Sequence, residues 1–216
     1  MPESKEKQPR IWGVFVGTFS PFHAGQAKIL KKFATHLDKI IIFVAGLKEQ
    51  VETPFSYDLR KKIIKDSLGP LSYKVKIMPA LSRKKGKLLQ TGYIPSLLDK
   101  SEAAQDVDGI FVITGADRFK DFKEQMDDVK GKKWKHVRVI DGGLGLNDFG
   151  DKVDATAIRG ALLANDTSFI KSYMAPLISD NPNVFKAIYQ KMKQEIETTV
   201  DSQQFEKMVK KPEKKQ

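Results

Sequence analysis

A ten-residue segment brings together residue types that bind phosphate. Residues 17–26 read Gly-Thr-Phe-Ser-Pro-Phe-His-Ala-Gly-Gln, between an apolar run and a run with helical spacing. In such a strand-loop-helix unit the free amides and the helix dipole point at one spot, which predicts an anion site. His23 can donate a hydrogen bond to a phosphate oxygen or stabilise charge that develops during group transfer. Pro21 stiffens the turn, and Gly25 lets the backbone approach a ligand closely.

A second candidate phosphate site lies at residues 154–159, which read Asp-Ala-Thr-Ala-Ile-Arg. The Thr156 hydroxyl, the free amides of a helix start and the forked Arg159 guanidinium would form a clamp for β- and γ-phosphates. Asp154 would repel a triphosphate unless Mg²⁺ intervenes or the carboxylate faces away. The alternative is a helix N-cap followed by a surface arginine.

A third candidate follows the apolar run at residues 109–114. Gly115 and Asp117 stand where a loop would border a nucleotide, and the Asp117 carboxylate could bond a ribose hydroxyl. It could equally cap the helix that follows. Three scattered histidines and the absence of cysteine predict no protein-held metal site.

Strands that alternate with helices must position these loops. Apolar runs predict five strands, and helical spacing recurs between them. The predicted strands are residues 11–16, 39–45, 73–78, 109–114 and 137–140. The alternation predicts an α/β fold with a doubly wound, mostly parallel five-stranded sheet. Ligands of such sheets bind beyond the carboxyl ends of the strands, which is where the candidate residues stand.

The C-terminal part of the chain is predicted to be helical from Thr156 to about Val209, broken at Pro176 and Pro182. An apolar stripe at four-residue spacing predicts one buried helix face; it consists of Val184, Ile188, Met192 and Ile196. We expect this stripe to pack on another chain, as a self-association or assembly surface; the alternative is that it completes the protein's own core. The chain accordingly divides into a polar arm at residues 1–10, a main domain at 11–177 and a C-terminal helix with a basic tail at 178–216.

The charge of the chain favours phosphate-bearing partners. The net charge is +11 over 216 residues. Basic runs at residues 83–87 and 205–216 are expected to be solvated, with nucleic-acid binding as the alternative. No apolar run is long enough to span a bilayer, so no membrane association is expected. Together with the lack of cysteine, this predicts a cytoplasmic protein.

With these residues in view, the chain resembles the nucleotidyltransferase superfamily whose loop reads G-x-F-x-P-x-H-x-G-H. Gly17, Phe19, Pro21, His23 and Gly25 match that loop, and the departure is Gln26 in place of the second histidine. Glutamine can donate to a phosphate oxygen but cannot carry a positive charge, so binding can persist while turnover falls.

Three further segments resemble the same superfamily in the same order. Residues 53–60 are similar to the N-P-[FL]-[ST]-x-x-[ED]-[RK] segment of archaeal-type nicotinamide-nucleotide adenylyltransferases and their bacteriophage relatives. Residues 115–119 resemble the G-[SA]-D-x-[FLV] turn, and residues 154–159 resemble S-[AS]-[ST]-x-[IM]-R, with Asp154 in place of serine. The resemblance spans about residues 10–177.

The resemblance implies a Rossmann-like nucleotidyltransferase that binds ATP or CTP with Mg²⁺ and a phosphate-bearing small molecule. It implies that His23 and Gln26 stabilise the transition state. It also implies a set of nucleotide- and phosphate-binding residues, namely Gly17, Thr18, Phe19, Gly25, Gly115, Asp117, Thr156 and Arg159. The alternative is a weakly active or inactive member with a structural role, in the host cytoplasm or the virion if a phage encodes it.

Overall fold

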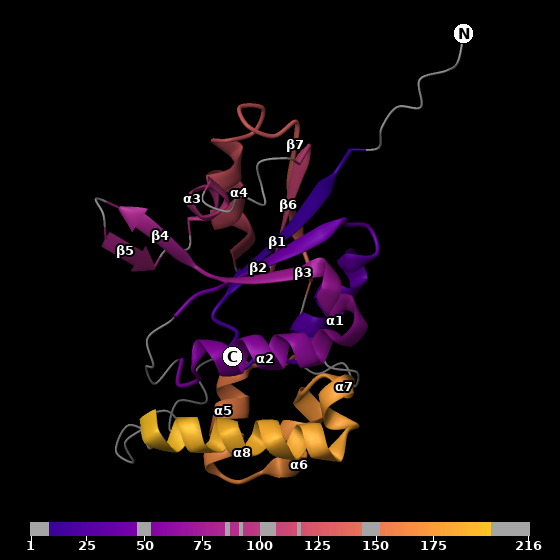
Figure 1. Ribbon diagram of the computed structural model, residues 1–216, viewed down its shortest axis with the longest axis vertical. Helices are drawn as coiled ribbons and strands as arrows, with labels where there is room; N and C mark the ends of the chain where they lie inside the picture. The colour runs from indigo at the N-terminus through magenta and orange to yellow at the C-terminus, as the bar shows by residue number, and fades with distance from the viewer. Residues whose placement is uncertain are drawn as a thin grey trace, which may run out of the picture.

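A parallel five-stranded sheet forms the centre of the protein. The computed structural model describes residues 9–46, 53–84, 87–90, 93–99, 107–115, 118–143 and 152–199, with the backbone alone given for 82–84 and 87–90. The strand order is β3-β2-β1-β6-β7, and all neighbours are parallel. The strands are β1 (Ile11–Gly17), β2 (Lys39–Val44), β3 (Val75–Pro79), β6 (Gly109–Thr114) and β7 (His136–Asp141) (Figure 1).

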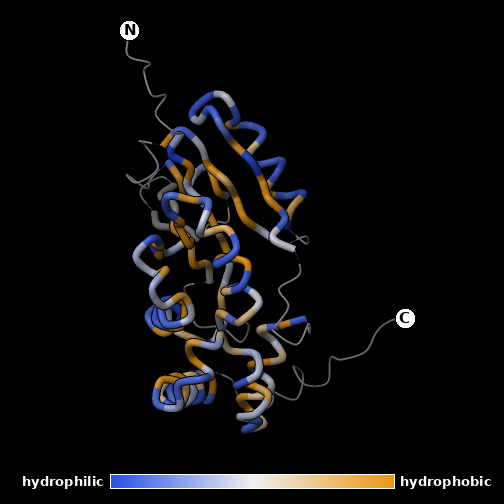
Figure 2. The backbone as a smooth tube through the Cα atoms, turned by 90° about the vertical axis from the view of Figure 1, so that its right-hand side faces the viewer, coloured by the Kyte–Doolittle hydropathy of each residue, from blue (hydrophilic) through white to orange (hydrophobic). Residues whose placement is uncertain are grey.

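Helices cover both faces of the sheet. Helices α1 (Ala24–Ala34) and α2 (Tyr57–Leu68) share one apolar cluster with the inward side chains of β1 and β2. Helices α3 (Ile94–Asp99) and α4 (Phe119–Asp127) share a second cluster with the opposite side chains. The strands between them are mostly hydrophobic, as Figure 2 shows. This arrangement confirms the predicted doubly wound α/β fold, because helices pack on both faces of a parallel sheet.

The predicted strands lie within two residues of the observed ones, and β6 has the predicted bounds. The structure differs from the prediction in the segments that connect the strands of the sheet. A short 3₁₀ helix, η1 (Gly69–Lys74), follows α2, and an antiparallel hairpin of β4 (Leu81–Lys84) and β5 (Lys87–Gln90) occupies the basic segment. Nothing in the sequence pattern of that segment alternates clearly, so neither the hairpin nor α3 was predicted.

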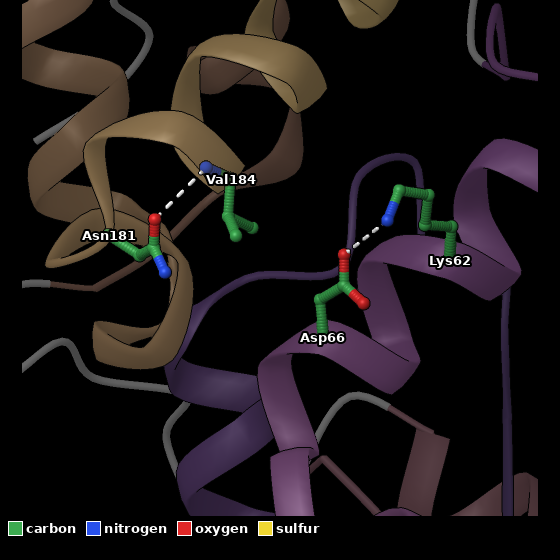
Figure 3. Close-up of polar contacts among 4 residues, drawn as sticks. All are labelled: Lys62, Asp66, Asn181 and Val184. Carbon is green, nitrogen blue, oxygen red and sulfur yellow. Dashed lines mark hydrogen bonds and ion pairs between the residues drawn. The ribbon is translucent and has the colours of Figure 1, made fainter.

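In the part of the chain that the structure describes, four helices follow the sheet and gather beyond α2 (Figure 1). They are α5 (Ala155–Leu163), α6 (Thr167–Tyr173), α7 (Pro176–Ser179) and α8 (Pro182–Thr199). Helix α8 begins where the Asn181 side chain accepts a hydrogen bond from the Val184 N–H, 3.2 Å away. Figure 3 shows this cap beside the surface ion pair of Lys62 and Asp66 on α2.

The packing of α8 corrects the expectation that its apolar stripe contacts another chain. Ile188, Met192 and Ile196 are at most 1% exposed and belong to the same core cluster as α1 and α2. Helix α8 contacts α2, α5 and α7. The periodicity correctly indicated a buried face, but the face completes the protein's own core.

Several parts of the chain lie outside the described residues. They include the first eight residues of the polar arm, the basic tail from residue 200, and much of the glycine-rich segment after β7. Among the helices that the structure does describe, none combines the length and the apolar character needed to cross a membrane.

Candidate nucleotide-binding site

The loop between β1 and α1 lies at the point where the strand order reverses. From β1 the chain proceeds to β2 and β3 on one side, and later returns to place β6 on the other side of β1. Helices on opposite faces diverge at such a point and leave a crevice at the carboxyl ends of the strands. Three candidate segments therefore lie at the carboxyl ends of the strands. They are the β1–α1 loop, Gly115 after β6 and the start of α5.

An aromatic anchor fixes the conformation of this loop. Phe19 is 2% exposed, and its ring packs against Phe15 and Phe22 at centroid distances of 5.3 and 5.7 Å. Its φ of 50° is in the left-handed region, which costs a non-glycine residue about 1 kcal/mol. A Cβ at Gly17 would lie 3.0 Å from the Phe19 ring. The Phe19 side chain is thus committed to the core, so any contribution to ligand binding would come from its backbone.

His23 is the N-cap of α1 and is 6% exposed. Burial lowers its pKa from 6.5 to about 4, and the Asp154 carboxylate offsets part of that shift. The ring is therefore neutral at physiological pH and carries one N–H donor. Within the described part of the chain its Nδ1 atom has no hydrogen-bond partner. A buried nitrogen without a hydrogen-bond partner at the N-terminus of a helix is available to bond a ligand.

Gln26 has a structural partner that the sequence did not predict. It is the third residue of α1, and its side-chain oxygen accepts a hydrogen bond from the His23 backbone N–H at 3.3 Å. This is the glutamine half of a capping box, which satisfies an amide that the helix leaves open. The glutamine thus fixes the backbone of His23, and its amide group keeps its own two N–H donors.

Helix α5 presents the second candidate cluster to the same loop. Asp154 is its N-cap and accepts a hydrogen bond from the Thr156 N–H at 2.8 Å. Arg159 donates from Nη1 to the Ser20 carbonyl at 2.6 Å and from Nη2 to the Thr156 hydroxyl at 3.0 Å. The alternative of a surface arginine is wrong, because Arg159 is only 6% exposed. The N-cap itself is confirmed.

Arg60 is the functional candidate that the sequence analysis did not single out. It is fully buried, and its guanidinium donates to the carbonyl oxygens of Thr18, Ala45 and Gly46, each at 2.7 Å. It therefore ties α2 to the loops that follow β1 and β2. The family-like segment at residues 53–60 contains this arginine, but a helical pattern gives no sign that one arginine is buried.

The third candidate cluster is described only in part. The Gly115 carbonyl accepts a hydrogen bond from the Arg118 N–H at 3.2 Å, and the loop after β7 is held near β6 by a Gly142 N–H bond to Thr114. Asp117 lies outside the described residues. The N-cap position of α4 is occupied by Arg118.

No resident metal site is built from the described side chains. Within the ranges that the structure covers, no group of three His, Cys, Asp or Glu residues could hold a metal ion. Mg²⁺ is bound in many nucleotide sites mainly by phosphates and water. The residues present therefore suit a metal that arrives with a nucleotide.

The family model that describes cytidylyltransferase-like proteins matches residues 14–200. This match includes the β1–α1 loop, the α5 cluster and all of α8. It extends beyond the resemblance seen in the sequence, which ended near residue 177.

Three solved structures share the fold at low sequence identity. A protein assigned as a nicotinate-nucleotide adenylyltransferase from Vibrio parahaemolyticus is 19% identical, with a TM-score of 0.53 over 83% of this chain and 98% of that chain. The Plasmodium falciparum nicotinic acid mononucleotide adenylyltransferase complexed with NaAD is 16% identical, with a TM-score of 0.56 over 84% and 98%.

The third is a bifunctional NMN adenylyltransferase/ADP ribose pyrophosphatase from Francisella tularensis, complexed with AMP and a manganese ion. It is 20% identical, with a TM-score of 0.56 over 87% of this chain and 52% of that chain. At these identities the three structures establish a common fold.

Proposed function

Because this chain belongs to the cytidylyltransferase-like family, we propose that it is a nucleotidyltransferase acting on a nucleoside triphosphate and a phosphate-bearing small molecule. The observation that carries the proposal is the bond from Arg159 to the Ser20 carbonyl, which joins the N-terminus of α5 to the His23 loop. The N-termini of α1 and α5 thereby come together at the carboxyl ends of the strands, with His23 and Arg159 as candidate phosphate ligands. Such helix starts attract anions.

The proposed reaction is an in-line displacement at the α-phosphorus. A phosphate oxygen of the second substrate forms the new P–O bond while the bond to the leaving pyrophosphate breaks, without a covalent enzyme intermediate. The neutral His23 ring donates a hydrogen bond to the α-phosphate, where charge develops. Positioning and charge stabilisation dominate the catalysis of such transfers.

The remaining residues bind and orient. The Thr156 N–H is already bonded to the Asp154 carboxylate. The other amides at the start of α5, the Thr156 hydroxyl and Arg159 hold the leaving pyrophosphate, and Mg²⁺ enters as part of the substrate complex. A triphosphate would compete with the Thr156 hydroxyl for one Arg159 N–H, so binding exchanges one hydrogen bond for a stronger charge-assisted bond.

The first substrate pair to test follows from the solved structures of similar fold. We propose ATP with nicotinic acid or nicotinamide mononucleotide, followed by CTP, phosphopantetheine and glycerol phosphate. The test is a screen of all pairs for pyrophosphate release with Mg²⁺ present. His23→Asn in the same preparation serves as the control for contaminating enzymes. Pyrophosphate release by the wild type alone supports the proposal, and silence across every pair contradicts turnover.

One observation favours a second candidate function, a family member with weak or no turnover that serves in an assembly such as a phage particle. Gln26 replaces a residue that could be charged, and its oxygen is occupied by the capping bond to His23. The two candidates are separated by Gln26→His, which restores a donor that can be charged. Raised turnover supports the enzyme, whereas silence of both proteins supports the structural role.

A nucleic-acid-binding role would rest on net charge alone. Binding to DNA or RNA that weakens steeply with added salt, without any nucleotide specificity, would favour it over both candidates.

A further inference from the structure

A buried arginine connects the two loops that border the proposed nucleotide site. Arg60 contacts the carbonyl oxygens of Thr18, in the His23 loop, and of Ala45 and Gly46, after β2. Its Nε–H also faces the carbonyl oxygen of Ser56, one turn earlier, at 3.4 Å. A single guanidinium thus has hydrogen bonds to three separate backbone segments. Only its planar fork can serve all of these acceptors together.

A carboxylate from the C-terminal helix lies at the other end of this network. Glu195 of α8 accepts hydrogen bonds from the Ser56 N–H at 2.6 Å and from the Ser56 hydroxyl at 2.9 Å. Ser56 is the N-cap of α2, the helix that carries Arg60. Thr199 continues the contact, since its hydroxyl lies 3.4 Å from the Pro54 carbonyl. Residues 139 positions apart in the chain are therefore joined directly.

We propose that Arg60 is a positioning residue for the nucleotide site and that Glu195 of α8 holds it in place through Ser56. The ligand named in this inference rests on the function proposed above. The C-terminal helix, which contributes no residue to the candidate phosphate clamp, would then set the geometry of the His23 loop.

The charges in this network explain why the two residues are needed together. Burial lowers the pKa of Arg60 to about 10, and the Glu195 carboxylate counteracts that shift, so the guanidinium remains charged at neutral pH. An unpaired charge in a protein interior costs several kcal/mol. Three carbonyl oxygens and one nearby carboxylate compensate for that cost. Removing the carboxylate weakens the compensation and loosens the loop that Arg60 holds.

The test uses two substitutions in the full chain and a matched control. Glu195→Gln keeps the size of the side chain and one oxygen acceptor but removes the charge. Arg60→Lys keeps the charge but replaces the fork by a single ammonium group, which cannot reach all three carbonyls. Glu197→Gln is the control, because Glu197 lies on α8, is exposed, and pairs only with Lys193 among the described salt bridges.

Two readouts separate positioning from simple stability. The first is the Kd of MgATP by calorimetry, corrected for the folded fraction. The second is the NMR titration of the His23 ring, which needs no ligand. His23 is buried and belongs to the same loop as Thr18, whose carbonyl oxygen accepts a hydrogen bond from Arg60. Burial lowers its pKa most, and Asp154 is the charged group that counteracts this shift.

We expect Glu195→Gln and Arg60→Lys to weaken MgATP binding about tenfold, which corresponds to about 1.4 kcal/mol. We also expect the pKa of His23 to rise toward its ordinary value in both variants, and Glu197→Gln to match the wild type. A lower Tm with unchanged Kd and unchanged His23 titration would overturn the proposal, because the network would then be structural only. If the wild type binds no nucleotide, the proposed function fails, while the His23 titration still decides the inference.

Discussion

The buried environment of His23 disfavours protonation of its ring. Because its pKa is about 4 in the folded chain and 6.5 in the unfolded chain, the unfolded state binds more protons between these values. Stability therefore falls as the pH falls from 6.5 to 4, and this residue accounts for up to about 3 kcal/mol. A neutral ring also preserves its single donor at the pH of the cell.

The first prediction is that His23→Asn removes this component of the pH dependence. The difference in unfolding free energy between variant and wild type should be constant above pH 6.5 and should shift by about 3 kcal/mol in favour of the variant near pH 4. Urea unfolding at several pH values measures it. A difference that stays flat from pH 7 to 4 would mean that His23 is solvated. His36→Asn, at an exposed position after α1, is the matched control.

The second prediction concerns Arg159, which joins α5 to the His23 loop. Arg159→Ala should weaken triphosphate binding by about tenfold or more, because a hydrogen bond to a charged group contributes about 1.5–3 kcal/mol. Monophosphate binding should fall much less. Calorimetry with ATP and AMP gives both values, and Arg138→Ala, on the exposed side of the edge strand β7, controls for the loss of one positive charge. Equal losses for ATP and AMP would remove Arg159 from the phosphate clamp.

The sequence indicated two segments that the structure brings together, because each is a local motif. Arg159 of the second segment donates to the Ser20 carbonyl in the loop that carries His23, while the ligand-binding roles of these residues stay predictions. The roles of Gln26 and Arg60 were not predictable in the same way. The buried guanidinium of Arg60 depends on where distant backbone atoms come to lie, and no sequence spacing indicates this. The Gln26 bond is local, but the residue at its N-cap is histidine, whereas the sequence signature of a capping box has serine or threonine there.

At the level of elements, the positions of the strands were predicted well, but the surfaces on which the helices pack were predicted poorly. The inner strands β2 and β6 are mostly buried and therefore appear as continuous apolar runs such as residues 109–114. The edge strands β3 and β7 are only partly buried, and their sequences carry charged residues between the apolar ones. The stripe on α8 was recognised from its period, but a period only shows that one face is buried. The identity of the covering surface, here α2, α5 and α7, had to come from the structure.

The third prediction follows from the burial of α8. Met192 is 0% exposed within the main core cluster, so Met192→Ala should lower the free energy of unfolding by about 2–5 kcal/mol. Lys191→Ala, its exposed neighbour on the same helix, should change stability by no more than about 0.5 kcal/mol. Urea denaturation measures both variants. If Met192→Ala retained wild-type stability but lost self-association, the stripe would belong to an interface between chains after all.

The core and the candidate site suggest that the whole molecule is one cooperative unit, with the proposed ligand site at the carboxyl ends of the strands. Core residues of α1, α2, α5 and α8 belong to a single cluster, and the network from Glu195 to Arg60 connects the last helix to the first loop. Nucleotide binding at the loop should therefore stabilise the C-terminal helix together with the sheet. A ligand that binds only the folded state raises the stability of everything that unfolds with its site.

The last prediction tests this coupling together with nucleotide binding itself. At a concentration one hundred times its Kd, MgATP should add about 2.7 kcal/mol to the folded state. For a chain of this size each kcal/mol raises Tm by about 2–4 °C, so scanning calorimetry should show one transition that moves upward by about 5–10 °C. Mg²⁺ alone and AMP should produce smaller shifts, since neither supplies the β- and γ-phosphates that α5 is proposed to hold. A second, unshifted transition would show that α8 unfolds independently of the site. An unchanged Tm with ATP and with CTP at millimolar concentration would contradict nucleotide binding altogether.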